Sequence, residues 1–270
     1  VTGEQGWWNK LISEEGAISP KHYTILSFNI PGNAYDGREA QDPEAFELRD
    51  VARLFLLALQ ELDIKEVYAI IGASMGGALT WQIAYLQPTL AEHIFPIACD
   101  YRASDWLLTQ TLIQKQILAH STHPLEDARI HAMSCYRTPQ SLNVRFSGQR
   151  DSRGSGTGRY DVESWLLYHG DALARRFKLS AYQVMTHLTS TIGVCQEEAE
   201  LAHIRSAIHL VSIDRDLLFT HDRAEVTYEA LRSLGADVSL SVIHSIHGHD
   251  AFLMEYKQLN HIVRPYFPIH

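Results

Sequence analysis

The stretch between residues 67 and 99 constrains the fold more than any other part of the chain. Val67–Ile71 is a short apolar run typical of a buried strand, and Met75–Leu86 has the pattern of a helix that ends near Pro88. His93–Cys99 is a second apolar strand. Parallel strands need a crossover connection, and a helix in that place covers one face of their sheet. This order therefore predicts an α/β protein with a mostly parallel sheet.

The same alternation continues on both sides of this stretch. Before it, His22–Ile30 is a β-rich run, and Pro43–Leu62 has apolar residues near helical spacing. After it, the predicted elements are a strand, a helix, a strand and a closing helix, at Ile208–Ile213, Asp222–Leu234, Val238–Ile243 and Ala251–Val263. The two parts together predict a single sheet covered by helices on both faces.

A block of helical patterns interrupts this alternation. The predicted helices are Ala103–His120, Val162–Arg176 and Ala181–Ile192, and the block contains no convincing strand. Ser147–Arg159 predicts a loop, because its GSGTG lacks the spacing of a phosphate-binding motif. We therefore expect an α/β core formed by residues 1–102 and 203–270, with a helical lid inserted at residues 103–202.

Charge and cysteine content narrow the class of protein. The formal net charge is -9, and an acidic chain gains nothing from a phosphate backbone, which excludes nucleic-acid binding. No apolar run reaches the roughly 18 residues that a membrane span needs. Cys99, Cys135 and Cys195 form no CxxC pair, which predicts reduced thiols in a cytoplasmic protein. The chain begins at Val1 without an initiator Met or a signal peptide, so we expect it to start inside a longer natural sequence.

Ser74 lies in the glycine-rich turn between the first predicted strand–helix pair. Gly72–Gly76 reads GASMG and fits the Gly-x-Ser-x-Gly nucleophile elbow in its strand–turn–helix context. In such a turn the serine has positive φ, so the residues two positions away on either side must be small. The N–H of Met75, at the start of the helix, would donate to an oxyanion. The alternative is a tight turn whose glycines serve packing alone.

An acid and a histidine follow Ser74 in the order Ser, Asp, His, which favours a nucleophile over a packing residue. A serine hydroxyl needs a base to remove its proton, and the base needs an acid to orient it. Asp214 and Asp216 both follow the strand at 208–213. The histidines after the next strand are His244, His247 and His249. Their spacing also resembles part of the HxHxDH motif of metallo-hydrolases, but Ala and Phe at positions 251 and 252 disfavour a metal site.

Several segments resemble the homoserine O-acetyltransferase family, a branch of the α/β-hydrolase fold. The resemblance runs over almost the whole chain, and the pairing of GHDAFL with the elbow is its most specific part. The segments are GWWNKLI (6–12), LRDVAR (48–53), YRTPQSLNVRF (136–146), VESWLLYHGDALARRFKLSAY (162–182), RDLLF (215–219) and GHDAFL (248–253). The elbow departs from the family, since it reads GASMGGAL where members usually have GGSMGGMQ.

The resemblance assigns roles that spacing leaves open. It implies that Asp216 is the acid and His249 the base, and that Asp250 binds the amine of the substrate. Thr2–Gly3 resembles the end of the family's oxyanion loop, which implies that the N-terminal strands of the fold are missing from this chain. Where the family has a lid arginine for the substrate carboxylate, the alignment places Lys115, with Arg102 as another candidate cation.

The resemblance also implies a reaction. An acetyl group would pass from acetyl-CoA, the co-substrate, through an acyl-serine to the hydroxyl of L-homoserine, a step in methionine biosynthesis. It implies small-molecule substrates, no bound cofactor or metal, no nucleic acid or membrane partner, and a homodimer formed through the lid helices. The changed acceptor positions keep a second hypothesis open, a serine hydrolase or esterase with the same Ser, Asp and His. A third is a non-catalytic scaffold that retains the fold.

Overall fold

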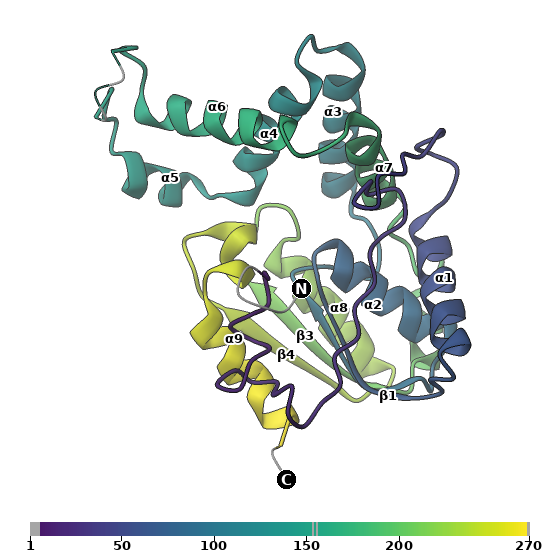
Figure 1. The fold of residues 1–270 in the computed structure, drawn as a ribbon. Coiled ribbons are helices and arrows are strands. Elements are labelled where there is room, and N and C mark those ends of the chain that lie inside the picture. The colour runs from purple at the N-terminus through teal and green to yellow at the C-terminus, as the bar shows by residue number, and fades with distance from the viewer. Residues whose placement is uncertain (1–5, 153, 155, 269–270) are drawn as a thin grey trace.

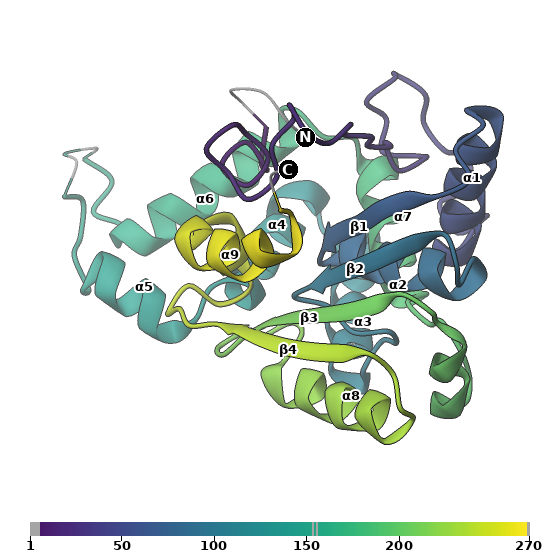
Figure 2. The same ribbon diagram turned by 90° about the horizontal axis from the view of Figure 1, so that it is seen from below.

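The core of the protein is a parallel sheet. The computed structural model describes residues 6–152, 154 and 156–268. Within them the sheet has four strands in the order β1-β2-β3-β4, which is also their order in the chain (Figure 2). The strands are β1 (Val67–Ala73), β2 (Ala91–Ile97), β3 (Ala207–Ile213) and β4 (Val238–Ile243). All of the pairs are parallel, so the carboxyl ends of the strands meet along one edge. The predicted α/β fold is confirmed.

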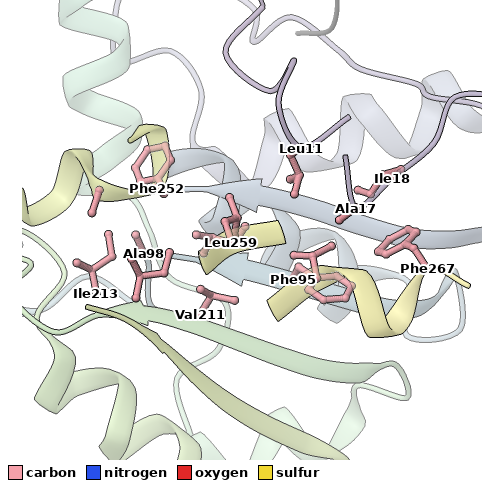
Figure 3. Packing of buried hydrophobic residues seen from close by; sticks show 14 residues of the cluster. Leu11, Ala17, Ile18, Phe95, Ala98, Val211, Ile213, Phe252, Leu259 and Phe267 are labelled. Atoms are coloured by element: carbon pink, nitrogen blue, oxygen red, sulfur yellow. The ribbon is translucent and has the colours of Figure 1, made fainter. Parts of the chain in front are cut away.

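Alternate residues of the central strands pack against opposite layers, as a sheet buried on both faces requires. Phe95 and Ile97 of β2 join a cluster with α9 (Tyr256–Val263) and the N-terminal segment (Figure 3). Ile94, the residue before Phe95, faces the other layer. That layer consists of α1 (Leu48–Glu61), α2 (Met75–Leu86) and α8 (His221–Ser233). Trp81 of α2 is fully buried in it.

Five helices form a separate layer beyond one end of the sheet (Figure 1). They are α3 (Asp105–His120), α4 (Pro124–Tyr136), α5 (Pro139–Phe146), α6 (Asp161–Ala174) and α7 (Leu179–Ser190). Ser104 caps α3 by accepting from the N–H of Leu107, and Thr138 caps α5 by accepting from the N–H of Ser141. The helices α4 and α5 were not individually predicted. None of the described helices is long and apolar enough to cross a membrane.

The strand predicted at residues 22–30 does not form. The segment is extended, and Tyr23 contacts Tyr68 of β1 while Phe28 stacks on Phe55 of α1. Its burial alternates on either side of residues 26 and 27, but no ladder joins it to β1. The alternation therefore reflects one-sided packing of side chains, which extended backbone achieves without hydrogen-bonding to a neighbouring strand.

Two predicted helices differ most from their expected bounds, whereas the other helices that differ do so by one or two residues at an end. The helix expected from Pro43 begins at Leu48, because Asp42 accepts from the N–H of Glu44 and holds a turn there. The closing helix expected at 251–263 is divided into a 3-10 helix η2 (Gly248–Leu253) and α9. The remaining 3-10 helices, which were not predicted, are η1 (Glu198–His203) and η3 (Arg264–Tyr266).

Candidate active site

Ser74 occupies a strained turn at the carboxyl end of β1. It has φ 54° and ψ -123°, a conformation that non-glycine residues rarely adopt. Its N–H donates to the carbonyl of Ile97 at the end of the adjacent strand, over 2.9 Å. The turn is therefore fixed to the sheet on one side and continues into α2 on the other. Persistent strain of this kind is typical of functional sites.

The steric requirement for glycine around Ser74 differs from the sequence argument at one position. A Cβ atom on Gly72 would collide with the backbone of Gly76, as expected for the residue two before the serine. A Cβ atom on Gly76 would meet no atom within 4 Å, so the expectation for the residue two after is wrong. The close approach belongs to Gly77, whose Cβ would collide with Cys99 after β2. Gly77 is therefore the position at which α2 packs tightly on the sheet.

The structure brings Ser74, Asp216 and His249 into one hydrogen-bonded chain. Nε2 of His249 lies 2.9 Å from Oγ of Ser74, and Nδ1 lies 2.7 Å from Oδ2 of Asp216. An ionised carboxylate only accepts, so Nδ1 carries the proton and Nε2 is free to accept from the serine. This arrangement can activate the hydroxyl as a nucleophile and then hold the resulting imidazolium.

The other strand-end candidates are directed elsewhere. Asp214 bonds to His244 at 3.2 Å and to the N–H of Ser245 at 3.0 Å. His247 contacts Arg137 of the lid. The three histidines therefore have three different partners. No group of three metal-ligating side chains is found in the part of the chain that the structure describes.

Backbone donors fix the acid in place. Oδ1 of Asp216 accepts from the N–H groups of Leu218 and Phe219, over 2.7 Å and 3.0 Å. The remaining oxygen, Oδ2, faces His249, and the side chain is fully buried. Three hydrogen bonds thus satisfy a carboxylate that would otherwise be costly to bury.

Charge and aromatic packing set the state of the base. Burial alone would lower the pKa of His249, but the charge and hydrogen bond of Asp216, with the charge of Asp250, raise it above its ordinary value. The imidazole lies among three rings, those of Tyr136, Phe219 and Phe252, with centroid distances of 5.5–5.7 Å. These rings restrict its rotation and exclude water from it.

Of the two predicted oxyanion donors, only the N–H of Met75 belongs to a residue that the structure describes. Met75 is the first residue of α2, so its N–H has no acceptor one turn earlier and is available to a ligand. Thr2–Gly3, which the family resemblance associates with the second donor, lies outside the described residues. Trp8 of the nearby N-terminal segment stacks on Phe252, with centroids 6.3 Å apart.

The predicted substrate-binding residues fall in different environments. Asp250 follows the base directly, with its side chain 26% exposed, and burial raises the pKa of its carboxyl. Lys115 of α3 forms a 2.8 Å ion pair with Glu44. Arg102 lies over the ring of Tyr101, 5.3 Å from its centroid. Asp250 thus adjoins the base. Within the described residues, neither Lys115 nor Arg102 forms a hydrogen bond or an ion pair with Ser74 or His249.

Two lid arginines near the base were missed by the sequence analysis. Arg129 of α4 lies over the ring of Tyr136, 5.6 Å from the centroid, and that ring contacts His249. Arg137 is buried, with Nη1 4.0 Å from Oδ2 of Asp250. The spacing of Arg129, Ala132 and Tyr136 on one helical face, one turn apart, was the available signal. Only the fold shows which residues that face meets.

The comparisons with known proteins agree with this fold. The family model described as the alpha/beta hydrolase fold matches residues 5–178. The chain belongs to the alpha/beta hydrolase fold family. The expected resemblance to homoserine O-acetyltransferases is also confirmed. The homoserine O-acetyltransferase of Trichormus variabilis is 28% identical over 286 residues, which cover 95% of this chain and 78% of that protein.

Solved structures of two functional classes share the fold. The homoserine O-acetyltransferase of Bacillus anthracis superposes with a TM-score of 0.82 at 13% identity, over 99% of this chain and 82% of that one. An acetylester hydrolase from Corynebacterium glutamicum superposes with a TM-score of 0.79 at 18% identity, over 97% and 81%. At these identities the likeness shows the fold alone. Transferases and hydrolases are therefore both compatible with it.

Proposed function

We propose that this protein is an O-acyltransferase that moves an acetyl group from acetyl-CoA to the hydroxyl of L-homoserine. The observation that carries the proposal is the chain of contacts from Ser74 through His249 to Asp216, at 2.9 Å and 2.7 Å. The names of the relatives support acetyl as the transferred group and homoserine as its acceptor. The reaction would belong to methionine biosynthesis, and the free thiols support a cytoplasmic location.

The proposed reaction has two half-steps at Ser74. Its Oγ attacks the thioester carbonyl while His249 Nε2 takes the proton, and the N–H of Met75 donates to the oxyanion. The C–S bond breaks, and His249 returns the proton to the leaving thiol. The acceptor hydroxyl then attacks the acyl-serine, with His249 again as base, and the ester product leaves as Oγ regains its proton.

Charged groups beside the base support an amino acid as acceptor. Asp250 forms no side-chain hydrogen bond with the described residues, so its carboxylate oxygens are available to an ammonium group. Arg129 has no ion-pair partner among the described residues and lies one aromatic ring from His249. A planar guanidinium binds a carboxylate by two bonds, which Lys115 cannot do. We therefore include Arg129 with Lys115 and Arg102 as a candidate for the acceptor carboxylate.

The alternative is a hydrolase in which water replaces the amino-acid acceptor, and the changed acceptor positions, with Lys115 in place of the family's lid arginine, support it. Release of thiol from acetyl-CoA, with and without L-homoserine, separates the two. Homoserine-dependent release that is lost in Ser74→Ala supports the transferase, and release unaffected by homoserine supports the hydrolase. An acyl group found on Ser74 by mass spectrometry would support the intermediate. Failure of a fluorophosphonate to label Ser74 would support the non-catalytic scaffold.

A homodimer through the lid is also proposed. The outer surface of α3 exposes Leu108, Leu112 and Ile113, with exposed fractions of 40%, 58% and 37%. Contiguous exposed apolar residues are typical of protein–protein contacts. Sedimentation velocity of the protein and of Leu112→Glu would test this. A wild-type dimer that becomes a monomer in the variant supports the lid interface.

A further inference from the structure

Arg137 is a buried arginine at the junction between two lid helices. It is the C-cap residue of α4, and only 6% of its surface is exposed. Its Nε and Nη2 atoms donate to Oγ of Ser141 in α5, over 3.2 Å and 2.6 Å. Nη2 also donates to Nδ1 of His247, over 3.0 Å. One guanidinium group therefore joins the lid to the loop that precedes the base.

A second set of contacts joins the same two segments. The hydroxyl of Thr138, next to Arg137, donates to the carbonyl of Ile246. Gly248 has φ 67°, and a Cβ atom there would lie 3.0 Å from the carbonyl oxygen of Tyr136. The α4–α5 junction thus packs closely against residues 246–248. Because His249 and Asp250 follow directly, their placement depends on the docked position of the lid.

The charge of Arg137 is directed to Asp250. Nη1 lies 4.0 Å from Oδ2 of that carboxylate, and the two side chains are 7% and 26% exposed. A buried arginine is costly without a compensating charge, and Asp250 is its only ion-pair partner among the described residues. The separation leaves the carboxylate oxygens free of a direct hydrogen bond from the guanidinium. Arg137 therefore favours the ionised form of Asp250 and leaves its carboxylate oxygens available to a ligand.

We propose that Arg137 is a positioning residue. When the lid is docked, it holds residues 246–248, the base loop, and keeps Asp250 ionised to receive the ammonium group of the acceptor. The part that concerns the acceptor rests on the proposed function. The part that concerns the charge of Asp250 does not.

The charged groups around Asp250 fix the direction of the expected effect. Burial raises the pKa of Asp250, Asp216 raises it further, and His249, Arg137 and Arg129 lower it. Arg145 of α5, His169 of α6 and His247 are further charged or titratable groups near Arg137 within the described residues. Removal of the Arg137 charge therefore moves the pKa of Asp250 to a higher value.

The first test measures the ionisation of Asp250 directly. The carboxyl carbons are labelled with ¹³C and titrated by NMR, with Asp250→Asn to assign the signal. We expect the midpoint to move to higher pH in Arg137→Met and to return toward the wild-type value in Arg137→Lys. Arg175→Met, which removes an exposed lid arginine, should leave it unchanged. A midpoint that does not move in Arg137→Met would overturn the proposal.

The second test measures the acceptor. In Arg137→Met the KM for L-homoserine should rise about tenfold, the value of one charge-assisted contact, with a larger rise at lower pH. Labelling of Ser74 by a fluorophosphonate should stay within about threefold of wild type, because the hydrogen bond from Thr138 to the carbonyl of Ile246 still holds the loop before His249. An equal loss in labelling and transfer, together with a lower Tm, would indicate a structural role and overturn the proposal.

Two further measurements separate the possible failures. If Arg137→Met does not fold, Ser141→Ala removes the oxygen that holds the guanidinium but keeps its charge, and it should shift the midpoint in the same direction by less. No shift in Ser141→Ala would then contradict the proposal. If the wild type shows no dependence on an amino-acid acceptor, the proposed function fails, while the ¹³C titration still decides the role of Arg137.

Discussion

Oδ2 of Asp216 lies 2.7 Å from Nδ1 of His249, and both side chains are almost completely buried. Asp214, two residues earlier in the same loop, is bonded instead to His244 at 3.2 Å. The chain therefore contains two carboxylates in one loop that face different histidines, and only one of these histidines contacts Ser74. This pair gives a matched control for the role of the acid.

Asp216→Asn should abolish most activity while the fold is retained. The amide can still accept from the N–H groups of Leu218 and Phe219, but it no longer favours the tautomer of His249 that accepts from serine. We expect kcat to fall about ten thousand-fold, as in other proteins with this arrangement. Asp214→Asn should change kcat less than about threefold. Similar losses in both variants would contradict the assignment of Asp216 as the acid.

Activity should fall as pH decreases through the raised pKa of His249. Burial lowers this pKa, but Asp216 and Asp250 outweigh it, and the base acts only in the neutral form. The rate of fluorophosphonate labelling against pH measures this directly. The midpoint of labelling should lie above the pKa of a free histidine, about 6.5. A midpoint below that value would contradict the prediction.

The same raised pKa has a consequence for stability. Protonated His249 contributes stability that is fully present below the unfolded-state pKa and is lost as pH rises through the folded-state value. The Tm of wild type should therefore exceed that of His249→Gln by a larger margin at about pH 5.5 than at about pH 9, which lie below and above the range in which histidine titrates. An equal margin at both values would show that the folded-state pKa is not raised.

Gly77→Ala should destabilise the protein, because the new Cβ would collide with Cys99. Overpacking of this kind costs about 1–3 kcal/mol in the free energy of unfolding. Gly76→Ala is the matched control, since a Cβ there meets nothing within 4 Å and alanine favours the helix by about 0.5–1 kcal/mol. Urea unfolding of both variants tests this. Adding Cys99→Ala should relieve part of the Gly77→Ala loss, because Sγ is removed while Cβ remains 3.1 Å away.

The elements that the sequence located best are those in which pattern and packing agree. The helix Met75–Leu86 and the strand Val238–Ile243 were predicted with the bounds that the structure has. The strand predicted at residues 22–30 was wrong because a β-rich composition does not report the presence of a hydrogen-bonded neighbour. The division of the last helix depends on Ala251, whose carbonyl accepts from the N–H groups of both Met254 and Glu255. Local propensity does not contain that information.

The site was predictable where residues follow one another in the chain, and less so where separate segments meet. The elbow and the order Ser, Asp, His are visible in the sequence, and the family resemblance selected Asp216 and His249. The contacts of Arg137 join positions about 110 residues apart, and no periodicity reports them. The role of Lys115 and the limits of the lid at 103–202 stay predictions.

Arg129 and Lys115 offer the sharpest test of how the acceptor is bound. Lys115 is paired with Glu44 at 2.8 Å, whereas Arg129 lies over Tyr136 beside the base. If Arg129 binds the acceptor carboxylate, Arg129→Met should raise the KM for L-homoserine by about 10–100-fold, the value of a charge-assisted bidentate pair. Lys115→Met should change it less than about threefold. The KM for acetyl-CoA serves as the internal control in both. A large effect of Lys115→Met with none of Arg129→Met would return the carboxylate site to the lysine that the family alignment selects.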